Sequence, residues 1–94
     1  MAEIVCVHRL RGREGRSAFE FDCRAAGVEA TICWRERDQA WLPTNWLGQS
    51  IPAAQIAMAA GADEAQAAAE LADAAALCER EYLRRDPTPL RAVA

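Results

Sequence analysis

The residues of this chain that could do chemistry are one histidine, His8, and four cysteines. Cys6 and His8 stand two positions apart in a predicted strand, so both side chains point to the same face of the sheet. Cys23, in the next predicted strand, can lie across from Cys6. Thiolate and imidazole groups are common zinc ligands, so these three residues outline a candidate zinc site, and a thiol beside an imidazole could also act as a nucleophile.

We nevertheless expect neither a metal nor another cofactor, and no enzyme activity. The sequence lacks the Cys-x-x-Cys pairs of common zinc modules, and phosphate loops and dinucleotide-binding motifs are absent too. His8 is expected to be a structural residue that points into the core. A small Cys/His metal protein or enzyme that uses His8 with Cys6 or Cys23 is the alternative.

Three other groups of residues are candidates for binding a partner. An arginine-rich turn at residues 11–16 could recognise carboxylates or phosphates, because a guanidinium group binds them with two parallel hydrogen bonds. Trp46, in a predicted loop, could anchor an interface or plug one end of the core. Acidic residues on a predicted long helix could meet a basic surface. The candidate contact residues are Arg11, Arg13, Arg16, Trp46, Glu70, Asp73, Glu79 and Glu81.

Alternating apolar and polar residues predict the strands of an antiparallel sheet. Short turns rich in glycine or charged residues separate these strands, and Pro43 is expected to end the last one. The predicted strands are Glu3–Leu10, Ser17–Cys23, Val28–Arg35 and Ala40–Leu42.

The pairing of successive strands predicts which residues share a face. If each hairpin pairs even-numbered with odd-numbered positions, one face is apolar and Trp34 lies opposite Trp41. This apolar face holds Ile4, Cys6, His8, Leu10, Phe19, Phe21, Cys23, Val28, Ala30, Ile32 and Trp34. The other face is expected to carry cross-strand ion pairs and a small apolar patch of Val5, Val7 and Cys33, through which a homodimer could form.

The alanine-rich C-terminal half predicts two helices over the apolar face. Ser50 can cap the first helix, which ends at Gly61. The second runs roughly from residue 63 to residue 85 and begins with Asp63, a good N-cap residue. Helical spacing directs one stripe of this helix toward the core, namely Ala67, Leu71, Ala74, Ala75, Cys78 and Tyr82.

The expected fold is therefore a single α+β domain over residues 1–86, followed by a flexible tail at 87–94. It is a four-stranded antiparallel meander sheet covered on one face by two C-terminal helices, in the order ββββαα. The 94 residues carry a net charge of −3, so we expect no direct nucleic-acid binding. No apolar run is long enough to cross a bilayer, so we expect a cytoplasmic protein with reduced cysteines and no membrane partner.

In size, single-domain build and lack of a catalytic motif, the chain resembles small phage and mobile-element proteins that inhibit host machinery, such as anti-CRISPR proteins. The resemblance implies an inhibitor that binds a bacterial CRISPR effector or another nucleic-acid-handling complex, with acidic residues in place of phosphates. Arginine as the only basic residue type, together with the many alanines, indicates a bacterial or phage genome of high GC content. An antitoxin or adaptor-type regulator is the alternative binding role.

Overall fold

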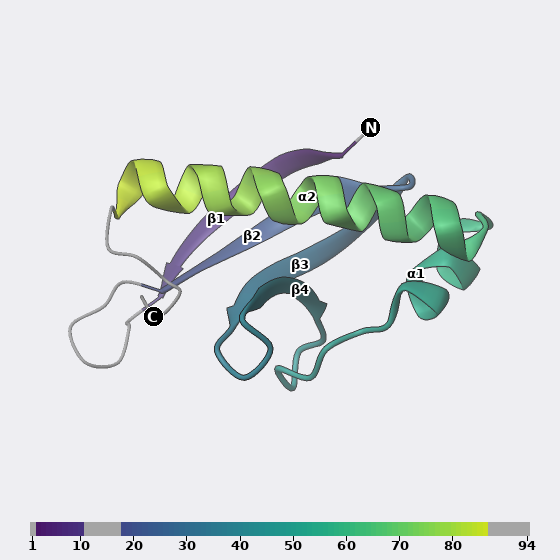
Figure 1. The fold of residues 1–94 in the computed structure, drawn as a ribbon, viewed down its shortest axis with the longest axis horizontal. Coiled ribbons are helices and arrows are strands. Elements are labelled where there is room, and N and C mark those ends of the chain that lie inside the picture. The colour runs from purple at the N-terminus through teal and green to yellow at the C-terminus, as the bar shows by residue number, and fades with distance from the viewer. Residues whose placement is uncertain (1, 11–17, 87–94) are drawn as a thin grey trace.

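The protein is a two-layer α+β domain, described here from a computed structural model that covers residues 2–10 and 18–86. The predicted fold class is confirmed: a four-stranded antiparallel sheet in the order β1-β2-β3-β4 precedes two helices. The long helix α2 runs across one face of the sheet, and α1 lies near its beginning (Figure 1). The elements are β1 Glu3–Leu10, β2 Ala18–Ala25, β3 Val28–Arg35, β4 Ala40–Thr44, α1 Ala53–Ala60 and α2 Glu64–Arg85. The predicted arginine turn at 11–16 and the tail at 87–94 lie outside the described residues.

A β-bulge at Val5 divides the pairing between β1 and β2 into two registers. Ile4 pairs with Cys23 before the bulge, but Cys6 pairs with Asp22 after it. One extra residue turns every later side chain of the strand to the opposite face. The prediction that Cys6 and His8 face the core is therefore wrong: both are exposed, and Val7 packs against the core instead.

The other two strand pairs have the predicted register. Phe21 pairs with Ile32 on β3, and Trp34 pairs with Trp41 on β4. The two tryptophan rings meet edge to face with centroids 5.8 Å apart, a favourable arrangement for aromatic rings. The predicted apolar face is thus confirmed on β2 and β3.

The core lies between this face of the sheet and helix α2. All of the predicted stripe of α2 is buried except Ala75, which is half-buried. Tyr82 and Phe21 are the largest of the fully buried side chains, and Phe19 stacks edge to face on Tyr82. Small alanines elsewhere on the stripe let the helix axis approach the sheet closely.

The ends of the helices are confirmed in part. Asp63 caps α2, since its Oδ1 accepts a hydrogen bond from the Gln66 N–H at 2.7 Å. Gly61 ends α1 in the left-handed conformation, with φ 67°. The prediction that Ser50 caps α1 is wrong, because the N-cap is Pro52 and Ser50 instead bridges to Thr44 beside β4.

Two strands are longer than predicted. β2 continues to Ala25 because a two-residue turn, Ala26 and Gly27, connects it to β3. β4 continues through Pro43 to Thr44. Proline is tolerated there because β4 is an edge strand, so no further strand needs its missing N–H group.

No helix or strand among residues 2–10 and 18–86 covers the second face of the sheet, here called the open face. Arg24 lies on it between two acidic partners, 2.8 Å from Glu3 and 3.6 Å from Glu29, which confirms the predicted cross-strand ion pairs for this arginine. The predicted apolar patch is wrong, because the bulge turns Val7 away from Val5 and Cys33. In the same described part of the chain, neither helix has the length and apolar character needed to cross a membrane.

Candidate functional site

The loop after β4 holds a tightly hydrogen-bonded turn at residues 45–49. The Asn45 side-chain oxygen accepts hydrogen bonds from the N–H groups of Leu47 and Gln49, at 2.9 Å and 3.0 Å. The backbone N–H of Asn45 also donates to the Gln49 carbonyl. From β3, the Arg35 guanidinium donates to the carbonyl of Gly48. Such an Asx-type network fixes the backbone of a turn without help from the core.

This turn displays two large apolar side chains to solvent. Trp46 is 91% exposed and Leu47 is 61% exposed. The prediction left open whether Trp46 plugs the core or faces outward, and it faces outward. An ordered exposed tryptophan is unusual because a buried aromatic ring stabilises a protein far more than an exposed one.

Residues just before and just after this turn line an apolar groove. It lies between β4 and α2 and has a volume of about 600 Å³. Its lining includes Pro43, Ser50 and Ile51, which flank the turn in the chain, and Leu71 and Ala72 from α2. The turn and the groove adjoin one another along the chain, and together they are here called the Trp46 surface.

The acidic residues predicted to form one edge of α2 lie on different sides of the helix. Glu70 and Glu81 lie on the side of the helix toward β1, whereas helical geometry turns Glu79 to the other side. Asp73 is exposed, and the other three are half-buried. Hydrogen bonds from Arg85 and Arg84 lower the pKa of Glu81, so its carboxylate is held within its own helix. Arg11, Arg13 and Arg16 lie outside the described residues.

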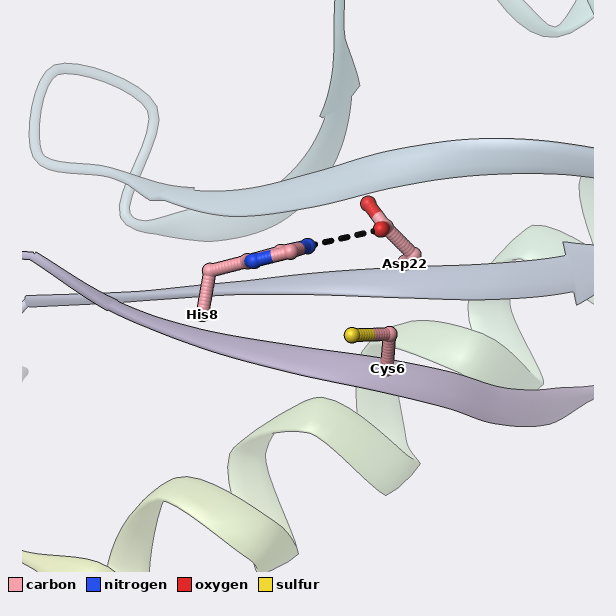
Figure 2. A group of neighbouring side chains, drawn as sticks. All are labelled: Cys6, His8 and Asp22. Atoms are coloured by element: carbon pink, nitrogen blue, oxygen red, sulfur yellow. Dashed lines mark hydrogen bonds and ion pairs between the residues drawn. The ribbon is translucent and has the colours of Figure 1, made fainter.

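Three potential metal ligands meet on the open face of the sheet: Cys6 and His8 from β1, and Asp22 from β2 (Figure 2). Their ligand atoms all lie within 4.8 Å of one another. His8 Nε2 is 2.8 Å from Asp22 Oδ2. The cluster brings a sulfur, a nitrogen and an oxygen donor together at the surface.

Both carboxylate oxygens of Asp22 are hydrogen-bonded, one to His8 and the other to Thr31. Its second oxygen, Oδ1, accepts a hydrogen bond from the Thr31 hydroxyl of β3 at 2.9 Å. The hydrogen bonds from His8 and Thr31 lower the pKa of Asp22, against a smaller opposing effect of burial. Asp22 is therefore an oriented carboxylate, ionised at neutral pH.

Cys23, the predicted third ligand, is not part of this cluster. It is fully buried on the opposite face of the sheet, with its Sγ 3.5 Å from that of Cys78 on α2. The contact with Cys23 and burial in the core both raise the pKa of Cys78. These two thiols act as small apolar core groups.

Sequence reasoning missed Asp22, Thr31 and Leu47 as site residues. Strand alternation puts Asp22 and Thr31 on the face opposite Phe21 and Ile32, where the structure has them, but Cys6 and His8 were predicted to lie on the other side. The Asn45 and Gly48 pair was the available signal for an ordered turn, because both residues favour turn conformations.

Comparison with known proteins found no relative: no protein family, no curated protein and no solved structure matches the chain.

Proposed function

We propose that this protein is a non-enzymatic binding protein whose main contact with a protein partner is the Trp46 surface. The observation that carries the proposal is the 91% exposure of Trp46 on a turn fixed by its own hydrogen bonds. A binding side chain on a rigid turn loses little conformational freedom when the partner arrives. Tryptophan is among the residues that contribute most to binding energy at protein interfaces.

The groove beside the turn supports the same proposal. Side chains that dominate binding at protein interfaces commonly fill pockets on the partner. Trp46 would fill such a pocket, and the apolar groove between β4 and α2 would receive side chains of the partner. Ala72 lines the groove and is exposed, so a partner side chain can reach it.

The acidic character of the chain segment that contains this surface favours a basic partner. Residues 40–79 contain five acidic residues and no arginine or lysine. Arg35, which reaches the turn from β3, is engaged with the Gly48 carbonyl. A basic protein surface, such as the nucleic-acid-binding surface of a bacterial effector complex, would complement this charge. The proposed role is therefore an inhibitor of the anti-CRISPR type that acts in the cytoplasm, where thiols such as Cys23 and Cys78 stay reduced.

Affinity capture with matched variants tests the proposal. Tagged wild-type protein, Trp46→Ala, Ala72→Arg and Leu83→Ala would be incubated with a nuclease-treated lysate of the native bacterial host. Leu83 is an apolar residue in the last part of α2 that is 46% exposed, and it serves as the control. Thermal unfolding of each variant shows whether the fold is retained.

We expect one stoichiometric partner with wild type and Leu83→Ala, and its loss with Trp46→Ala and Ala72→Arg. Loss of an interface tryptophan that contributes 2 kcal/mol or more lowers affinity by about 30-fold or more. Binding should also weaken as salt is raised, because charges attract less at high ionic strength. Equal capture by wild type and Trp46→Ala would refute the proposal.

A further inference from the structure

We propose that Cys6, His8 and Asp22 form a binding site for a divalent ion of the zinc class on the open face of the sheet. The site is separate from the Trp46 surface and does not depend on the partner proposal. It arises from the bulge at Val5, because this bulge turns Cys6 and His8 out of the core and toward Asp22. Bulges often serve to direct a side chain toward a functional site.

The distances fit a zinc site after small rotations of side chains. At usual bond lengths, the ligand atoms of a tetrahedral zinc ion lie about 3.3–3.6 Å apart. The three donor atoms here lie within 4.8 Å of one another, so closure requires shifts of about 1 Å or less per side chain. Cys6 and His8 stand on the same side of β1 and are exposed, so both can rotate (Figure 2).

The surrounding hydrogen bonds prepare the carboxylate for this role. Thr31 occupies Oδ1 of Asp22 and leaves Oδ2 directed at His8. Metal ligands are commonly oriented by a second group in this way. The ion would take the place of the hydrogen between His8 Nε2 and Asp22 Oδ2, and the neutral imidazole would carry its single hydrogen on Nδ1 instead. The Cys6 thiol would bind as a thiolate and release its proton to water.

The donor set selects the metal. Thiolate and imidazole favour zinc and similar transition ions, whereas magnesium and calcium require mostly oxygen donors. Three protein ligands leave one position of a tetrahedron for water or another small ligand. We therefore expect zinc and cobalt(II) to bind, and magnesium to have no effect.

The test uses purified protein that has been reduced and freed of metal with a chelator. Zinc chloride is titrated by calorimetry, and cobalt(II) chloride is titrated by absorption spectroscopy. We expect one ion per chain, with a near-ultraviolet band of thiolate bound to cobalt and the visible bands of a tetrahedral ion. Zinc should also protect Cys6 from alkylation, as read by mass spectrometry of the labelled peptides.

Matched variants assign the ligands. Cys6→Ser should remove the thiolate band, and His8→Gln and Asp22→Asn should each weaken zinc binding by at least about tenfold. Thr31→Val, which removes the hydroxyl that orients Asp22, should weaken it by about 10–100-fold. Cys33→Ser is the control, because Cys33 lies on the same face but bonds to Thr44 outside the cluster.

Two results would overturn the proposal. One is the absence of stoichiometric zinc binding by the wild-type protein at micromolar concentration. The other is a cobalt spectrum that is unchanged in Cys6→Ser or lost in Cys33→Ser, since the ion would then be held by other residues. All of the substituted ligands are at least partly exposed, so circular dichroism should show that each variant is folded.

Discussion

Val7 on β1 lies opposite Phe21 on β2, and both side chains face helix α2. This pairing exists only because the bulge at Val5 shifts the register of the strand by one residue. The same shift places Cys6 beside Asp22 on the open face. A single irregularity in the sheet therefore completes the core and assembles the proposed metal site.

The bulge predicts that two nearby substitutions in β1 differ in their effect on stability. Val7→Ala should lower the free energy of unfolding by about 1–2 kcal/mol, because two methyl groups are removed from the edge of the core. Cys6→Ala should change it by less than about 0.5 kcal/mol in metal-free buffer, because the side chain is exposed. Urea unfolding of both variants measures the difference. A larger loss for Cys6→Ala would mean that β1 has the unbulged register.

Leu71→Ala tests the packing of α2 on the sheet. Leu71 is 9% exposed and belongs to the core, so its truncation should cost about 2–5 kcal/mol. Asp73→Ala is the matched control on the same helix, because Asp73 is exposed and should be nearly neutral. A neutral Leu71→Ala would show that a different face of α2 meets the sheet.

The turn between β2 and β3 offers a stabilising substitution. Ala26 has φ 53° and Gly27 has φ 81°, the positive angles of a type I′ turn. Alanine is strained at such an angle, whereas asparagine adopts it readily, so Ala26→Asn should stabilise the protein by about 0.5–1 kcal/mol.

Gly27→Ala is the matched substitution in this turn that should destabilise the protein. No atom lies within 4 Å of the added Cβ, so only backbone strain opposes the change, and the cost should be about 1–2 kcal/mol. The midpoint temperature of thermal unfolding should therefore rise for Ala26→Asn and fall for Gly27→Ala. A shift in the same direction would contradict the turn conformation.

Asp22 should make stability depend on pH in acid. Its pKa in the folded protein lies below the ordinary value of 3.8, so ionised Asp22 stabilises the fold above that value. The stabilisation is lost as the pH falls through the lower, folded pKa. It should amount to at most about 1 kcal/mol, because the side chain is 34% exposed and solvent weakens the interaction.

Comparison of wild type with Asp22→Asn isolates this effect. The difference in unfolding free energy should be fully present at pH 5 and should shrink as the pH falls below 3.8. Chemical unfolding across this range in metal-free buffer provides the measurement. A difference that grows toward low pH would mean that the pKa of Asp22 is raised by folding.

Much of the fold could be predicted because its patterns have a single interpretation. The alternation of Phe19 and Phe21 with acidic residues leaves one choice of face, and the buried stripe of α2 follows directly from helical spacing. The turn containing Gly27 also fixes the register between β2 and β3. In these parts, local sequence and tertiary packing agree.

The bulge could not be predicted because β1 is apolar on both faces. Ile4 and Cys6 alternate with Val5 and Val7, so hydrophobicity does not distinguish one register from the other. The cluster of Cys6, His8 and Asp22 was hidden for the same reason. Trp46 was ambiguous because a tryptophan suits either a core or an interface, and only the hydrogen bonds around Asn45 determine where it points.

The most direct test of the binding proposal is site-specific crosslinking in the native bacterial host. A photoreactive phenylalanine derivative is introduced in place of Trp46 in one variant and in place of Leu83 in another. We predict a covalent adduct with one protein partner from position 46 and none from position 83. Adducts from position 83 alone, or from neither position while wild-type protein captures a stoichiometric partner, would contradict the assignment of the Trp46 surface as the binding site.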